Sequence, residues 1–313
     1  MPNVGRFLAR QLGCATTKMR RSNRIGQLIA LFQSSFYVEF DDEVCCIGHA
    51  EFNSGPLNII TDVPASVDWR QCGLRLGDKV RTAKDKISVG QLLEFSSKNA
   101  KVWYPPITGS DWNFASLQEG LNNLNTYYKN AIPSEGLGRF VLSDRSTIAA
   151  HPVSYFAEPA VDEFRYWLQG RIDTPKWLNS FIGLGPGLTP SGDDFIGGAM
   201  ITLRNLGDAN SVDQIWNICC PISLALGNRI SHAHLACAAS GYGSASLHET
   251  IIALMHGRNI KMRRAIEDLD RTGHTSGWDA LAGAVTACRA YLGDPNLRNR
   301  LQTVPSLIES LPR

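Results

Sequence analysis

The chain has little net charge and no long hydrophobic run. Its 313 residues include 31 Lys and Arg against 29 Asp and Glu, which gives a formal charge of +2. This small charge provides no strong field for nucleic acid, and the sequence contains no RNA- or DNA-binding motif, so we expect no nucleic-acid partner. No apolar stretch approaches the roughly 18–20 residues that span a bilayer, and no signal-peptide pattern occurs, so we expect no membrane partner.

Paired metal-binding or redox cysteines are also lacking. The eight cysteines include no CxxC pair and no zinc-ligand spacing, which indicates a reducing compartment and favours a cytoplasmic location. Cys219 and Cys288 fall on apolar helical stripes, where a thiol acts as a small hydrophobic group. We therefore expect no nucleophilic cysteine.

Acidic residues are absent before Glu39, although this segment contains several basic residues. We predict that residues 1–35 form a basic, partly ordered and solvated N-terminal extension, with a surface arm for an acidic partner as the alternative. The basic residues are Arg6, Arg10, Lys18, Arg20, Arg21 and Arg24.

The remaining pattern predicts an α+β protein with a β-rich N-terminal half, barrel- or sandwich-like, followed by a mainly α-helical C-terminal half. Residues 36–150 form the predicted β-rich domain, with one helix between Trp112 and Tyr128, and residues 151–313 form the helical domain. The strands are expected at Phe36–Phe40, Glu43–Ile47, Leu57–Ile60, Lys79–Thr82, Val102–Tyr104 and Phe140–Leu142.

The most distinctive string runs from Gly183 to Ile201, GLGPGLTPSGDDFIGGAMI. It matches neither GxGxxG nor GxxxxGK[ST], and no strand–helix alternation surrounds it, so Rossmann and P-loop folds are not expected. Its glycines allow backbone conformations that a Cβ would forbid. Ser191 is predicted as the N-cap of a helix whose first N–H groups are unpaired and bind an anion. The predicted anion-binding positions here are Gly185, Gly187, Thr189, Ser191 and Gly192.

Two adjacent carboxylates, Asp193 and Asp194, occupy the first turn of this predicted helix. They are candidate catalytic residues and candidate ligands of Mg²⁺, the one cofactor that this pattern suggests. Alternatively, they only complement the helix dipole. Because adjacent helical residues point about 100° apart, we predict different roles for the two.

Two further motifs occur in the helical half. The string Asn228-Arg229-Ile230-Ser231 places an arginine near a helix start, where it could bind phosphate or carboxylate. In GHTSGWD, Thr275 or Ser276 is predicted to cap the last long helix, and His274 is a candidate acid, base or oxyanion donor. We predict that Asp193 or Asp194, Arg229 and His274 line one pocket, with Asn228, Ser231, Thr275 and Ser276 as further anion-binding residues.

The strings GLGPGLTPSGDDF, NRIS and GHTSGWDALAG together resemble the AllH family, mainly over Ile182–Leu292, with a weaker likeness at Ser54-Gly55-Pro56-Leu57. This resemblance implies a subunit of bacterial oxamate carbamoyltransferase, which works with FdrA-like and other subunits in allantoin (purine) breakdown. The implied reaction moves a carbamoyl group between oxalurate and phosphate, giving oxamate and carbamoyl phosphate. The implied ligands are therefore small anions: oxamate or oxalurate, phosphate and carbamoyl phosphate.

Two alternatives remain open from the residues themselves. One is a phosphotransferase in which the glycine loop and the Asp pair hold nucleotide and magnesium. The other is a non-catalytic scaffold or ligand-sensing subunit.

Overall fold

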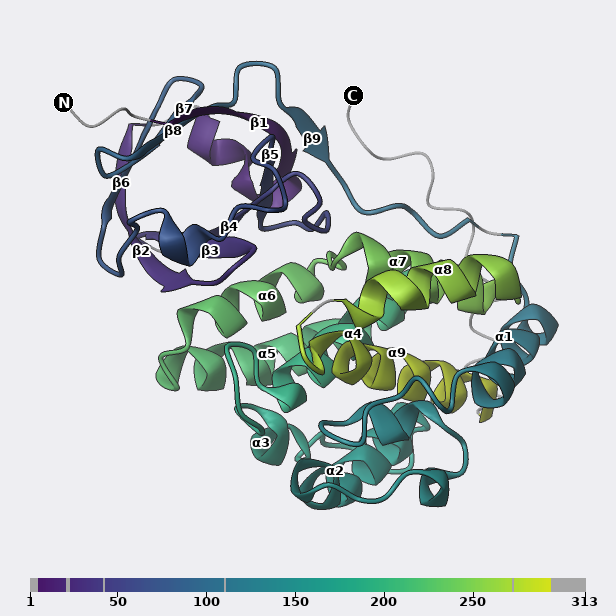
Figure 1. The fold of residues 1–313 in the computed structure, drawn as a ribbon. Helices are drawn as coiled ribbons and strands as arrows, with labels where there is room; N and C mark the ends of the chain where they lie inside the picture. The colour runs from purple at the N-terminus through teal and green to yellow at the C-terminus, as the bar shows by residue number, and fades with distance from the viewer. Residues whose placement is uncertain (1–4, 21–22, 42, 110, 272, 294–313) are drawn as a thin grey trace. The chain divides into compact units, whose positions relative to one another are not determined.

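The computed structural model describes residues 5–20, 23–41, 43–109, 111–271 and 273–293. The chain divides into two compact units, Met1–Pro105 and Pro106–Arg313. The first consists of strands and the second of helices, which confirms the predicted α+β class with a β-rich N-terminal part (Figure 1).

The N-terminal unit is a closed β-barrel. Eight strands form a ring in the order β1-β5-β4-β3-β2-β6-β7-β8, and β8 pairs with β1 to close it (Figure 1). The ninth strand pairs with the far end of β1, at Gln11–Gly13. The strands are β1 (Gly5–Gly13), β2 (Arg24–Leu31), β3 (Ser35–Phe40), β4 (Glu43–Gly48), β5 (Asn58–Thr61), β6 (Lys79–Ala83), β7 (Lys86–Val89), β8 (Leu93–Ser96) and β9 (Lys101–Trp103).

Alternating side chains fill the barrel. On β3, Phe36, Val38 and Phe40 are fully buried, as the period-2 pattern requires. Trp69, from a short 3₁₀ segment, packs edge-on against Phe36 and Phe95 with ring centroids 5.2 and 6.2 Å away. The aromatic packing therefore joins residues that are far apart in the sequence into one core.

The prediction of a solvated extension at residues 1–35 is wrong, because β1 and β2 are integral strands of the barrel. Arg6 and Arg10 are exposed on β1, whereas Ala9 and Leu12 are buried. The basic residues thus occupy the outward positions of an alternating strand. Arg21 lies outside the described residues.

The helical unit begins earlier than predicted. The observed division at Pro105–Pro106 lies well before the expected boundary at residue 150, because α1 packs against α7 and α9 rather than against strands. The helices are α1 (Phe114–Tyr127), α2 (Pro152–Leu168), α3 (Leu178–Phe181), α4 (Ser191–Asn205), α5 (Ala209–Ala225), α6 (Arg229–Ala239), α7 (Ala245–Met255), α8 (Asn259–Asp270) and α9 (Ser276–Gly293).

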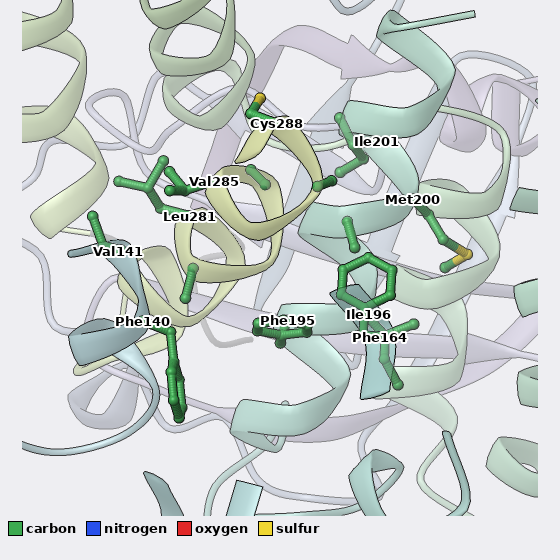
Figure 2. Packing of buried hydrophobic residues seen from close by; sticks show 14 of the residues in the cluster. Phe140, Val141, Phe164, Phe195, Ile196, Met200, Ile201, Leu281, Val285 and Cys288 are labelled. Carbon is green, nitrogen blue, oxygen red and sulfur yellow. The ribbon is translucent and has the colours of Figure 1, made fainter. Parts of the chain in front are cut away.

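The core of this unit lies between α4 and α9. Figure 2 shows Phe195, Ile196 and Met200 of α4 in the same apolar cluster as Leu281 and Val285 of α9. Glycines bring the two helices together: a Cβ on Gly198 would overlap the Ala280 carbonyl, and a Cβ on Gly283 would overlap the Phe195 carbonyl. This close approach fixes how the N-terminal turns of α4 and α9 meet.

The strand predicted at Phe140–Leu142 is instead part of a 3₁₀ segment, Gly138–Val141. Arg289 of α9 donates to the carbonyl oxygens of Phe140 and Val141, at 3.1 and 2.8 Å. These carbonyls are satisfied by a side chain, so the segment needs no neighbouring strand.

The thiols behave as predicted. The eight cysteines all lie within the described residues and form no disulfide. Cys219 and Cys288 are fully buried, and burial raises the pKa of Cys288 to about 12. Among the described helices, none has an apolar stretch long enough to cross a bilayer.

Candidate functional site

The glycine loop connects α3 to α4 and requires its glycines. Gly183, Gly185 and Gly187 have φ values of +79°, +105° and +108°. Side chains other than glycine rarely adopt these conformations. The local prediction from the glycine spacing is therefore confirmed at the level of the backbone.

The start of α4 differs from the prediction. Pro190 occupies the N-cap position without a side-chain cap bond, and Ser191 is the first helical residue. The N–H of Gly192 donates to Leu184 O at 2.9 Å, and that of Asp194 donates to Pro190 O at 3.0 Å. The prediction that these N–H groups are unpaired is thus wrong: the loop folds back to supply the acceptor for Gly192, and the N-cap residue supplies the acceptor for Asp194.

Asp193 fastens the loop and α6 to α4. Its Oδ1 accepts the N–H of Gly183 at 2.7 Å, and its Oδ2 accepts the hydroxyl of Ser231 at 2.5 Å. Burial raises the pKa of Asp193, while these two hydrogen bonds oppose the rise. Since both oxygens are occupied by the protein, Asp193 has a positioning role.

The NRIS motif holds the same loop from α6. Asn228 caps the helix by accepting the N–H of Ser231 at 3.1 Å, and its Nδ2 donates to Leu188 O at 2.9 Å. Arg229 follows as the first residue of α6 and is partly buried. Asn228 therefore joins the glycine loop directly, and Ser231 joins it through Asp193.

Asp194 points toward the start of α9 rather than toward α6. Its Oδ2 accepts the hydroxyl of Thr189 at 3.0 Å, and the Thr189 hydroxyl lies 3.2 Å from that of Ser276. Burial raises the pKa of Asp194 well above its ordinary value, and the negative charge of Asp279 raises it further. The hydroxyls of Ser276 and Thr189 oppose this rise.

Asp279, on the first turn of α9, is the other half of this acidic pair. Its side chain is fully buried, and its Oδ1 accepts the N–H of Leu137 at 2.5 Å. Burial raises the pKa of Asp279, while the N–H of Leu137 and the nearby hydroxyls of Ser191 and Thr275 oppose the rise. We call Asp194, Asp279 and the surrounding hydroxyls of Thr189, Ser191, Thr275 and Ser276 the acid–hydroxyl cluster.

Asp279 was not among the residues singled out from the sequence, although it lies within the GHTSGWD string. Thr275 was predicted as a cap of this helix. Its carbonyl oxygen accepts the N–H of Asp279 at 2.9 Å, which is a helical hydrogen bond of the first turn. An acid three residues into a helix usually only complements the dipole. Its burial against α4 depends on the tertiary packing.

His274 lies at the surface. Its side chain is 79% exposed, and its Nε2 is 2.7 Å from Glu135 Oε2. It acts on the cluster through charge alone, by lowering the pKa of Asp279.

The residues do not fit a magnesium site built on Asp193 and Asp194. Asp193 uses both oxygens for the protein's own N–H and hydroxyl groups, and within the described ranges no group of three or more His, Cys, Asp or Glu is placed to hold a metal ion.

Comparison with known families identifies this part of the chain. Residues 181–288 match the family described as oxamate carbamoyltransferase subunit AllH. The AllH segment contains the glycine loop, the NRIS motif and both acids of the acid–hydroxyl cluster. No solved structure matches the chain.

Proposed function

We propose that the chain is a subunit of an oxamate carbamoyltransferase that moves a carbamoyl group between an oxalurate-like substrate and phosphate. The main support is that residues 181–288, which contain all three motifs, match the AllH family. In addition, Asn228 and Ser231 bind the glycine loop and Asp193, and Thr189 of the same loop lies 3.2 Å from Ser276. Such a convergence of polar groups from distant segments is typical of ligand sites.

The residue types suit this chemistry. Oxalurate and phosphate are both anions, so the site needs cationic and N–H or O–H donors to offset repulsion and stabilise a tetrahedral oxyanion. Arg229, at the start of α6, is the cationic candidate, and the hydroxyls of Thr189 and Ser276 are neutral donors. The acids are suited to the opposite end of oxamate, its amide NH₂.

Direct transfer is the simpler route. Burial raises the pKa of Cys219, which lies near Asp193, so this thiol is not activated. Exposed His274 has its Nε2 2.7 Å from Glu135 Oε2. No covalent carbamoyl-enzyme intermediate is therefore invoked.

The partners are proposed from the family, namely FdrA-like and other carbamoyltransferase subunits. The test is formation of oxalurate and phosphate from carbamoyl phosphate and oxamate, measured on this chain alone and after addition of its co-encoded subunits. We expect turnover in the assembled complex. Absence of turnover there, with all subunits folded, would overturn the proposal.

The same assay addresses the scaffold alternative. Arg229→Ala should reduce turnover of the assembled complex at least tenfold, because a charged hydrogen bond to an anion contributes about 1.5–3 kcal/mol. Arg258→Ala, at an exposed arginine paired with Asp111, is the matched control. Equal turnover of both variants would favour a non-catalytic scaffold.

A further inference from the structure

One oxygen of Asp279 has no hydrogen-bond partner in the part of the chain that the structure describes. Oδ1 accepts the N–H of Leu137, but Oδ2, on a side chain with 0% exposure, accepts nothing. A buried acceptor without a donor costs about 1–3 kcal/mol, and more when it is charged. Such an atom in a cluster of polar groups indicates a donor supplied from outside the chain.

The backbone of Gly136 passes close to this carboxylate. Gly136 has a φ of +65°, and a Cβ there would lie 3.0 Å from Oδ2 of Asp279 and would overlap Oδ1. Across the cluster, Asp194 is linked to the start of α9 through the Thr189 hydroxyl, which lies 3.0 Å from Asp194 Oδ2 and 3.2 Å from the Ser276 hydroxyl. Thr189, Thr275 and Ser276 are only partly buried, so the cluster reaches the surface on their side.

We propose that Asp279, together with Asp194, binds the NH₂ group of a primary amide or carbamoyl substrate. This inference rests on the proposed function and adds to it which end of the substrate the two acids bind. An amide NH₂ carries two donor hydrogens, which match two carboxylate acceptors. A ligand that has a carboxylate in place of the NH₂ group has no hydrogen to donate, and its negative charge repels both acids. A methyl group leaves the acceptors unpaired.

The first test uses the wild-type chain and three anions of similar size. Oxamate ends in NH₂, oxalate has a carboxylate in its place and pyruvate a methyl group. Isothermal titration calorimetry, on the chain alone and in the assembled complex, should give at least tenfold tighter binding of oxamate than of either analogue, because a site built around a hydrogen bond strongly rejects ligands that lack it. Equal or tighter binding of oxalate or pyruvate would overturn the inference.

The second test exchanges the acceptor for a donor. In Asp279→Asn, Oδ1 can keep the bond to Leu137, and the amide NH₂ then replaces Oδ2. Oxamate affinity should fall at least tenfold while oxalate affinity rises, so that the preference is reversed. Asp194→Asn should also weaken oxamate binding, and it provides the test if Asp279→Asn does not fold. Glu267→Gln, at an exposed helical acid, is the matched control. Unchanged selectivity in a folded Asp279→Asn or Asp194→Asn variant would overturn the inference.

The two proposals fail in different ways. Turnover by the complex without preference for oxamate over oxalate would leave the carbamoyltransferase function standing and overturn the amide-binding inference. Preference for oxamate, reversed in Asp279→Asn, without turnover by any assembly would support amide binding and overturn the proposed function.

Discussion

The adjacent acids Asp193 and Asp194 have different surroundings, as their 100° separation on a helix requires. Asp193 binds Gly183 and Ser231, which belong to the loop and α6. Asp194 binds Thr189 and lies beside Asp279 of α9. Asp193 therefore holds the loop in place, whereas Asp194 belongs to the candidate binding cluster.

Substitution of the two acids should separate stability from binding. Asp193→Ala removes the acceptor for the Gly183 N–H and the Ser231 hydroxyl, and we expect a loss of about 1–3 kcal/mol in the free energy of unfolding. Asp194→Asn should retain stability at neutral pH and lose oxamate binding. Chemical denaturation measures the change in stability, and calorimetry measures the change in oxamate binding. Equal small changes in both variants would indicate that the two acids only complement the helix dipole.

The raised pKa of Asp194 predicts a pH-dependent stability. A carboxyl whose folded pKa exceeds its unfolded value, near 3.8, stabilises the fold fully below that value and loses this contribution as the pH rises through the folded pKa. Asp194→Asn should therefore become increasingly more stable than wild type as the pH rises above the unfolded value and through the raised folded pKa. The charged neighbours are Asp193 and Asp279, with His274 acting on Asp279. A stability difference that does not vary with pH would contradict this assignment.

Among the elements, α4 and α9 determine the geometry of the site. Their contact is close because Gly198 meets the Ala280 carbonyl and Gly283 meets the Phe195 carbonyl. The acids lie on the first turns of these helices, so a change in helix separation also moves Asp194 relative to Asp279.

Adjacent glycines on α4 provide a matched test of this packing. Gly198→Ala would place a Cβ against the Ala280 carbonyl and should destabilise the protein by about 1–3 kcal/mol, the usual cost of overpacking. Gly197→Ala would meet Ala238 Cβ at an ordinary 3.6 Å and should be neutral or stabilise by up to about 1 kcal/mol through helix propensity. Thermal unfolding of both variants measures the difference. A tolerated Gly198→Ala would show that the helices can separate without cost.

In the whole molecule, the two units have separate cores. The barrel cluster extends from Ala9 to Ala100, and the helical cluster extends from Leu117 to Leu292. Among the described residues, the two clusters share no buried residue, so each unit has its own hydrophobic driving force.

This division predicts that residues 106–313 fold as an isolated fragment. We expect a cooperative thermal transition and helical circular dichroism, because this unit has its own apolar core. The glycine loop, the acid–hydroxyl cluster and Leu137 also lie in this unit. Calorimetry with oxamate then tests whether the fragment also retains the ligand site. A fragment without a cooperative transition would show that the barrel is needed for folding.

The sequence alone determined the features that depend on neighbouring residues. Positive φ values follow from the glycines of the loop, and helical periodicity predicted α4, α9 and the burial of Cys219 and Cys288. The three motifs also sufficed for the family resemblance, which the AllH match confirms. Local geometry and side-chain periodicity carry this information because they involve residues only a few positions apart.

Only the tertiary structure decided which distant groups are partners. The closure of the barrel through β1, the bond from Gly192 to Leu184 and the pairing of Asp194 with Asp279 each depend on chain reversal or on contacts across the fold. A carboxylate at a helix start has the same local pattern whether it is solvated or buried. Burial against a second carboxylate raises its pKa, and that environment exists only after α4 and α9 have packed.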